Sequence, residues 1–280
     1  MIKITEPMRF FLEFISNTGI GKLNHYFCFL MIMQGIDIKT LSEKELDIKK
    51  RGASNTLRKA VCDKILESFP NPCWIGEGKA ERIYSPGIRF PYNRNRIKKT
   101  NNSSKLSHDI VCTDIIFQAV LSCLKSGCGY RYFSEYALEN NTLSESFGND
   151  FKTIIPDAVI LHEKTALFIE ADMDTMLLKE LEIKTENYAE YYHSNNFAKF
   201  NKTFNANYTG FRLCFVFNNP KRINKFKRYM LDEKEYLEQK WVLLCSYEEL
   251  NSRDFLNDNF WQTLEHGDKT ISIQDSLCGA

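Results

Sequence analysis

The chain has 280 residues, of which 43% are hydrophobic and 26% are charged. This is enough apolar material for a folded core, which excludes disorder as the dominant state, and the length suggests one or two domains. The 37 basic and 36 acidic side chains nearly cancel, so the net charge indicates neither a nucleic-acid partner nor a membrane partner. Any electrostatic argument must therefore be local.

The cysteine pattern is that of an intracellular protein. There are nine cysteines, an odd number, and no two of them form a C-x-x-C pair, so neither a disulfide framework nor a clustered zinc site is indicated. The N-terminus lacks the pattern of a signal peptide. The most apolar stretch, Tyr26 to Met33, is too short to span a bilayer. We expect a soluble cytoplasmic protein with no membrane contact.

The first 85 residues read as helices followed by a small hairpin. Apolar spacing predicts helices over residues 9–16, 23–34 and 53–69, the last with Ser54 as its N-cap. Residues 73–75 and 81–84 read as two strands joined by a tight turn. Helices followed by a hairpin are typical of a winged helix, which binds DNA. A small helical lobe with a β-hairpin and no DNA contact fits the pattern equally well.

Residues 86–107 are expected to form a basic linker. This stretch holds six basic residues and no acidic one, and four of them, Arg94, Arg96, Lys98 and Lys99, are candidates for contacts with DNA phosphates. Phe90 and Tyr92 favour nucleic acid slightly, because bases stack on such rings. The alternative is an ordinary solvated connector between two domains.

The rest of the chain alternates between helix and strand, which indicates a mixed α/β domain over residues 108–265. We expect the residues after His266 to form a flexible tail (266–280). The expected helices and strands are, in chain order, a helix over 110–125, strands over 154–161 and 166–171, a helix over 175–192, a strand over 211–217, a helix over 221–239 and a strand over 241–245.

Three acidic residues converge if the strands 154–161 and 166–171 form a hairpin. The short connection would pair Leu161 with Ala166, and counting back along both strands sets Asp157 opposite Glu170. Opposed side chains point to the same face, with Cβ atoms roughly 4.5–5.5 Å apart. Asp172, two residues on, shares that face. A divalent cation would stabilise such a cluster, although exposed acids at strand ends are common without one.

Basic residues lie on two of the expected helices. Lys184 interrupts an apolar stripe, because Leu177, Leu181, Tyr188 and Tyr191 lie on the same helical face. Its ammonium group either extends to solvent or is directed at the acidic cluster. Lys221 and Arg222 begin the next basic helix and would hold a DNA backbone, or they belong to a solvated surface.

Five short motifs follow one another in the second half of the chain: His108-Asp109, Ser134-Glu135, Pro156-Asp157, Glu170-Ala171-Asp172 and Lys184-x-x-x-Tyr188. In this order and spacing they resemble the replication-relaxation family, which includes MobC-type plasmid mobilisation relaxases. They also resemble the PD-(D/E)xK nuclease core, except that Asp172 stands where that core has a lysine. The family tends to continue with Arg-Gly after the motif that ends at Asp172, whereas this chain has Met173-Asp174.

The resemblance implies a winged-helix-like N-terminal region and a restriction-endonuclease-like mixed sheet flanked by helices. Asp157 and Glu170 would bind Mg²⁺ or Mn²⁺, with Asp172 as a further ligand. Glu135 would be a third acid, Lys184 the displaced core lysine, and His108 a general base or phosphate contact, unless it only caps and packs the helix start.

The activity implied is metal-dependent DNA strand nicking in plasmid mobilisation or replication. Metal-activated water or one of the tyrosines near Lys184 would attack the phosphate. The expected partners are DNA and other mobilisation or replication proteins. The alternative is a non-catalytic DNA-binding protein that keeps a degenerate nuclease fold.

Overall fold

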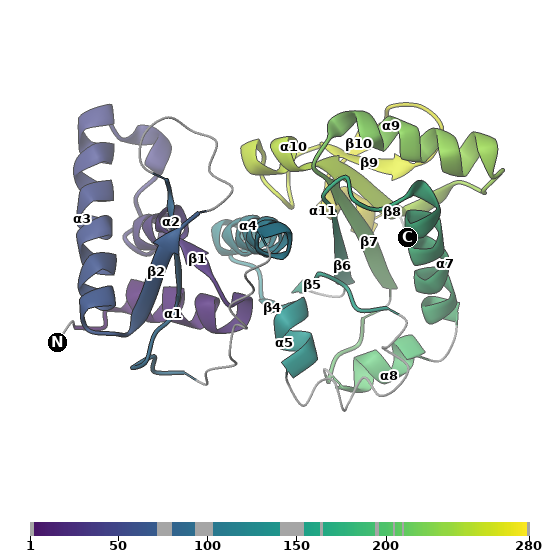
Figure 1. Ribbon diagram of the computed structural model, residues 1–280. Helices are drawn as coiled ribbons and strands as arrows, with labels where there is room; N and C mark the ends of the chain where they lie inside the picture. Colours follow the sequence, from purple (N-terminus) through teal and green to yellow (C-terminus); the bar gives the residue numbers. More distant parts are fainter. Residues whose placement is uncertain are drawn as a thin grey trace. The chain divides into compact units, whose positions relative to one another are not determined.

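The computed structural model describes residues 3–71, 80–92, 103–140, 154–162, 165–193, 196–203, 205–208 and 210–278. The chain divides into two compact units, Met1–Thr113 and Asp114–Ala280. The division falls inside helix α4 (Ser103–Ser126), whereas the sequence analysis expects a linker over residues 86–107. Figure 1 shows the elements of both units.

The first unit combines helices with a small antiparallel sheet. The strand order in this sheet is β1-β3-β2, so the strand between the first two helices joins the later hairpin. Phe14 packs edge-on against Phe29, with ring centroids 5.5 Å apart, in the core between α1 and α2. The elements are α1 (Glu6–Thr18), β1 (Gly21–Lys22), α2 (Leu23–Met33), a 3₁₀ turn (Ile38–Thr40), α3 (Glu43–Cys62), β2 (Leu66–Pro70), β3 (Arg82–Pro86) and the start of α4.

Helix α3 begins earlier and ends earlier than the sequence predicts. It starts after Ser42, whose side chain accepts a hydrogen bond from the Glu45 N–H in a capping box, and Ser54 lies inside it. It ends at Cys62, because Lys64 adopts a left-handed φ of 61° and reverses the chain. The predicted helix up to residue 69 is therefore wrong, and Leu66–Pro70 is a strand.

The first strand of the hairpin also begins earlier in the chain than the sequence predicts. Its described strands are β2 and β3, with Ser68 paired to Tyr84, and the predicted strand over 73–75 lies outside the described residues. The chain after β3 packs back on β2. The Gly87 N–H donates to the Ile65 carbonyl over 2.8 Å, and a Cβ at Gly87 would lie 2.5 Å from the Lys64 carbonyl oxygen. Only glycine fits this approach. Arg94, Arg96, Lys98 and Lys99 lie outside the described residues.

The second unit is built on a seven-stranded mixed sheet with the order β10-β9-β8-β7-β6-β5-β4. Strands β6, β7 and β8 are parallel, and the other neighbours are antiparallel. This confirms the expected mixed α/β class. The elements are β4 (Tyr130–Ser134), α5 (Glu135–Asn140), β5 (Ala158–His162), β6 (Thr165–Asp172), α7 (Leu178–His193), α8 (Asn196–Thr203), β7 (Gly210–Phe217), α9 (Pro220–Arg228), a π turn (Tyr229–Glu233), β8 (Gln239–Ser246), α10 (Tyr247–Ser252), β9 (Trp261–Leu264), β10 (Thr270–Ile271) and α11 (Ile273–Cys278).

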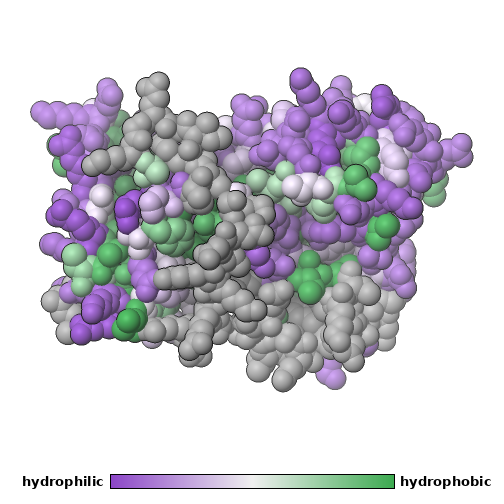
Figure 2. All heavy atoms as spheres, in the orientation of Figure 1, coloured by the Kyte–Doolittle hydropathy of each residue, from purple (hydrophilic) through white to green (hydrophobic). Residues whose placement is uncertain are grey.

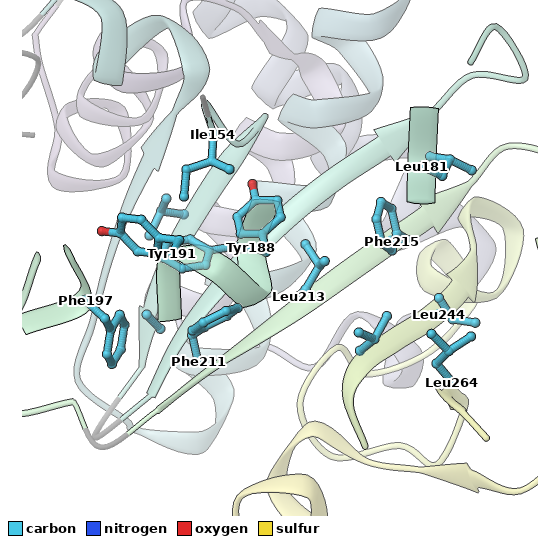
Figure 3. Close-up of a cluster of buried hydrophobic side chains, with 14 of the residues drawn as sticks. Ile154, Leu181, Tyr188, Tyr191, Phe197, Phe211, Leu213, Phe215, Leu244 and Leu264 are labelled. Carbon is cyan, nitrogen blue, oxygen red and sulfur yellow. The ribbon is translucent and has the colours of Figure 1, made fainter. Parts of the chain in front are cut away.

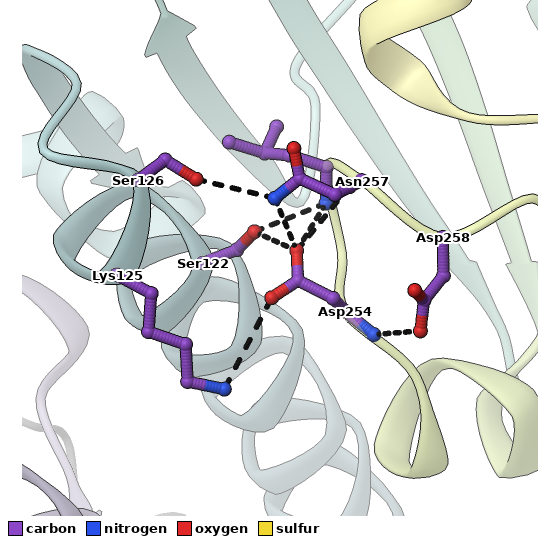
Figure 4. Close-up of polar contacts among 7 residues, drawn as sticks. Ser122, Lys125, Ser126, Asp254, Asn257 and Asp258 are labelled. Atoms are coloured by element: carbon purple, nitrogen blue, oxygen red, sulfur yellow. Dashed lines mark hydrogen bonds and ion pairs between the residues drawn. The ribbon is translucent and has the colours of Figure 1, made fainter. Parts of the chain in front are cut away.

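An aromatic core fills the space between this sheet and helices α7, α8 and α9. Alternate residues of β7, among them Phe211 and Phe215, face Tyr188 and Tyr191 of α7 (Figure 3). On the other side of the sheet lies the second half of α4 (Figure 1). Ser122 of α4 donates a hydrogen bond to Asp254, which also accepts one from the Asn257 side chain over 2.9 Å (Figure 4). These bonds fix α4 to the loop after α10.

The C-terminal residues form regular structure. Residues 266–280 were expected to be a flexible tail, but they contain β10 and α11, and Ile273 is fully buried. Arg212 of β7 donates to the carbonyl of Ser276 and so holds α11 against the sheet. Residues Lys105–Ser126 are long and apolar enough to cross a membrane, but 67% of their most apolar window is buried, as in the core helix of a soluble domain.

Candidate active site

The β5–β6 hairpin has the register that the sequence predicts. Leu161 pairs with Ala166 and Ala158 with Ile169, and the same register continued by one residue sets Asp157 opposite Glu170. The Asp157 N–H donates to the Ile169 carbonyl over 3.0 Å, which holds the chain in this register beyond the end of β5. The two acids therefore meet at the same end of the hairpin.

Glu135 joins them from the neighbouring strand. It follows β4 directly, and its N–H donates to the Asp157 carbonyl over 2.8 Å. The Asp157 carboxylate accepts a hydrogen bond of 2.7 Å from the N–H of Ala171 in β6. Main-chain hydrogen bonds thus place three acids, from three adjacent strands, at one level of the sheet.

Glu170 is bonded by two side chains from helix α7. It is 1% exposed, and one carboxylate oxygen accepts from Lys184 Nζ while the other accepts from the Tyr188 hydroxyl over 2.7 Å. The ring of Tyr188 stacks on Phe168, with centroids 5.6 Å apart, which fixes the hydroxyl. Lys184 is therefore directed at the acidic cluster, one of the two readings that the sequence leaves open.

Each of these charged groups shifts the pKa values of its neighbours. Burial, and then the charge of Asp157, raises the pKa of Glu170 to about 7, although Lys184 and Tyr188 act in the opposite direction. Burial alone would lower the pKa of Lys184, but the carboxylates of Glu170, Asp157 and Glu135 outweigh it, so this pKa is raised. Lys184 stays positively charged and is attracted by all three acids, of which it bonds Glu170.

Tyr188 is held in its neutral form. Burial, followed by the charge of Glu170, raises its pKa well above the usual value for tyrosine. Its side chain is only 1% exposed and its hydroxyl is a donor to Glu170. This arrangement favours a positioning role for Tyr188 over a nucleophilic one.

Asp172 lies on the same face of β6 but has a different partner. It is fully buried and accepts a hydrogen bond from Arg222 Nε, and the same guanidinium donates to the Met176 carbonyl. Burial raises the pKa of Asp172, and the bond to Arg222 opposes that shift. The guanidinium of Arg222 thus neutralises Asp172, and it lies beside Asp174 at 3.9 Å.

Two further predicted residues, His108 and Lys221, belong to other helices. His108 is in α4, on the part that belongs to the first unit, with its ring Nδ1 3.6 Å from the Cys112 sulfur. Lys221 is exposed at the start of α9, where its N–H is capped by Asn219. The structure thus brings together Asp157, Glu170, Lys184 and Glu135.

Two contacts escaped the sequence analysis. The hydrogen bond from Tyr188 to Glu170 could have been predicted, because Tyr188 lies four residues after Lys184 and therefore on the same helical face. The pairing of Arg222 with Asp172 could not have been predicted from the sequence, since fifty residues separate the two.

The donor set fits a hard divalent cation. Lys184 bonds Glu170, and the charges of Asp157 and Glu135 also act on it. Carboxylate oxygens such as these are the ligands that Mg²⁺ and Mn²⁺ favour. Burial, and after it repulsion from Asp157, keeps the pKa of Glu170 raised despite Lys184. An additional positive charge would relieve this repulsion.

A family model described as replication-relaxation matches residues 64–206, which include all four of these residues. No curated protein and no solved structure matches the chain.

Proposed function

The chain belongs to the replication-relaxation family, which indicates a role in plasmid replication or mobilisation, and from this premise we propose that it is a metal-dependent DNA-nicking protein of the relaxase type. DNA is then its substrate. The observation that carries the proposal is the convergence of Glu135, Asp157 and Glu170 on Lys184. Two or more carboxylates and a lysine at one end of a strand pair resemble the PD-(D/E)xK core.

In this proposal Asp157 and Glu170, with Glu135 beside them, hold Mg²⁺ or Mn²⁺. The bound cation would supply electrostatic stabilisation of the phosphate and a more acidic water. Lys184 then neutralises charge that develops on the phosphate oxygens, because its raised pKa keeps it protonated. Tyr188 keeps the Glu170 carboxylate in one orientation through its 2.7 Å hydrogen bond.

Asp172 and Arg222 also contribute to the proposed site. Asp172, bonded to Arg222, orients that guanidinium at the carboxyl ends of β6 and β7. Ligands of open α/β sheets bind at this end of the strands, so Arg222 is placed to contact a DNA phosphate. His108 stays a candidate phosphate contact, and Lys221 a candidate backbone contact.

For the first unit we propose a winged-helix-like fold. Its order of elements is helix, short strand, two helices and a hairpin, and the short strand pairs with β3 to give the order β1-β3-β2. A three-stranded sheet behind a helical layer is the arrangement that places one helix in the major groove. This unit would deliver the nicking unit to DNA in the cytoplasm, together with other mobilisation or replication proteins.

The test is nicking of supercoiled plasmid with Mg²⁺ or Mn²⁺. Asp157→Asn and Glu170→Gln remove one negative charge each with little change of shape, and both should abolish nicking. Glu190→Gln makes the same chemical change on the exposed face of α7 and should nick like the wild type. Equal nicking by all four proteins would end the proposal, provided that their unfolding temperatures show that each is folded.

A second function is favoured by one observation. Glu170 and Asp172 already have cationic partners in Lys184 and Arg222, so both carboxylates are neutralised within the protein. A non-catalytic DNA-binding protein with a degenerate nuclease fold would show this arrangement. It would bind duplex DNA equally well with EDTA or Mn²⁺, and it would nick no plasmid under either condition.

A further inference from the structure

The first unit contains a hollow of about 320 Å³ between the start of α2, the middle of α3 and β3. Small-molecule sites in proteins have volumes of roughly 300–1,000 Å³ and are mostly apolar, with a few polar groups among the apolar ones. Figure 2 shows mostly hydrophilic side chains along the edge that carries α3, whereas the hollow is lined mainly by apolar atoms. Its size and its lining are therefore those of a site for a small molecule.

The apolar part of the lining is held in place by the fold. Phe27 of α2 is 1% exposed and Tyr84 of β3 is 5% exposed, and Leu23 and Ala80 complete this part of the lining. Because aromatic rings pack favourably against one another, the Phe27 and Tyr84 rings suit a ligand whose body is itself an aromatic ring.

Two hydroxyl groups line the same hollow, those of Tyr84 and of Ser54 in α3, and neither forms a hydrogen bond in the part of the chain that the structure describes. Burial raises the pKa of the Tyr84 hydroxyl, although the charge of Arg82 opposes this shift, so the hydroxyl keeps its proton and can donate. Buried polar groups in proteins nearly always have a partner. An acceptor atom of a ligand would supply one for Tyr84. The uncharged polar side chain of Asn24 also lines the hollow and is exposed.

The charged groups around the hollow favour an anion. Lys50 forms no ion pair with any described residue, and its Nζ lies 5.8 Å from the centre of the Phe27 ring. Arg82 is a second cation and donates to a main-chain carbonyl of β2 over 2.9 Å. Glu81 is the one acid among the described lining residues, and its carboxylate lies 3.8 Å from Lys22 Nζ, which offsets its charge. The lining therefore has more donors than acceptors and a surplus of positive charge.

We propose that this hollow binds a small aromatic carboxylate. The ring of the ligand packs against Phe27, Leu23 and the Tyr84 ring, while its carboxylate accepts hydrogen bonds from the hydroxyls of Tyr84 and Ser54 and pairs with Lys50. Such a ligand contacts α2, α3 and β3 at once, so its binding stabilises the folded first unit by mass action. The inference is independent of the proposed nicking activity, because it concerns a different site and a different class of ligand.

The experiment titrates the full chain calorimetrically with two probes that share one ring system, 2-naphthoate and the uncharged 2-naphthalenemethanol. The carboxylate should bind roughly tenfold more tightly than the alcohol, because hydrogen bonds to a charged acceptor are stronger than those to a neutral one. Tyr84→Phe removes one donor and keeps the ring, and Lys50→Met removes the charge and keeps the apolar stem. Each should weaken naphthoate binding roughly tenfold and weaken binding of the alcohol much less.

Two further variants locate the binding. Ser54→Phe fills the hollow and should abolish binding of both probes. The matched control, Lys59→Met, removes an exposed lysine of α3 that does not line the hollow and should bind naphthoate like the wild type. All four variants should unfold near the wild-type temperature, because none of them removes a hydrogen bond or an ion pair between described residues.

Three results would overturn the inference: a wild type that binds neither probe, a wild type that binds the alcohol as tightly as naphthoate, or an unchanged naphthoate affinity in Tyr84→Phe, Lys50→Met or Ser54→Phe. Each of them leaves the nicking proposal intact.

Discussion

Replacing Lys184 with methionine tests the buried charge pair of the candidate site. The variant keeps the apolar stem and removes the ammonium group, so that Glu170, 1% exposed, loses its cationic partner. Breaking a buried pair in this way costs about 3–5 kcal/mol. Because Lys184 is one-third exposed and the Tyr188 bond remains, we expect the lower end, ~3 kcal/mol, which lowers Tm by roughly 6–12 °C.

The loss of stability caused by Lys184→Met should depend on pH, and it should be larger at high pH than at low pH. The pKa of Glu170 is raised to about 7 by burial and by Asp157, and it rises further when Lys184 is lost. A raised pKa in the folded state means that stability is present at low pH and falls as the pH rises through the folded value. The variant and the wild type should therefore differ little in stability well below pH 7, and the difference should grow as the pH rises from about 7 to the higher folded pKa of the variant.

The assay is urea unfolding in EDTA at several pH values. The double variant Lys184→Met with Glu170→Gln removes both charges, and it should recover most of the lost stability above pH 7, because no uncompensated charge is left buried. If the single and double variants lose the same free energy of unfolding at every pH, then Lys184 does not hold Glu170 and the reasoning fails.

Three further substitutions test other parts of the structure. Gly52→Ala should raise the free energy of unfolding by ~1 kcal/mol in urea melts, because its Cβ meets no atom within 4 Å. Ile273→Ala should lower it by about 2–4 kcal/mol, whereas a flexible tail would give no change. Tyr188→Phe leaves an oxygen of Glu170 without its donor and should cost about 1–3 kcal/mol by the same measurement.

The register of the β5–β6 hairpin could be predicted because side chains alternate strictly along a strand. Once Leu161 pairs with Ala166, every other pair is determined, and a slip by one residue would turn the apolar face to solvent. The same count located Asp157 and Glu170. The face of α7 could likewise be read from helical spacing, which placed Lys184 and Tyr188 together.

The ends of helices α3 and α9 could not be predicted in this way. Helix α3 ends through a left-handed Lys64, where the usual signal would be glycine. The predicted helix over 221–239 is divided, since α9 ends at Arg228 and a π turn continues only to Glu233. In both cases the residues are good helix formers and tertiary packing determines the boundary.

The partner of Asp172 was also beyond the sequence, because Arg222 belongs to a helix that follows the next strand. This pairing changes the interpretation of the E-x-D motif. Glu170 and Asp172 share one face of β6, but they are neutralised by cations from different helices, α7 and α9. The motif therefore divides into one acid that faces the other carboxylates and one that orients an arginine.

The two proposed functions predict opposite effects of Lys184 on cation binding. If Asp157, Glu170 and Glu135 hold a divalent cation, the ammonium group of Lys184 repels it, since it lies among the same three carboxylates. Lys184→Met should then bind Mn²⁺ more tightly in calorimetric titrations while it loses nicking activity. In a non-catalytic protein the lysine replaces the cation, and neither the wild type nor Lys184→Met would bind Mn²⁺ at this cluster. Tighter Mn²⁺ binding that Asp157→Asn abolishes would therefore favour the nicking protein, and its absence would favour the binding protein.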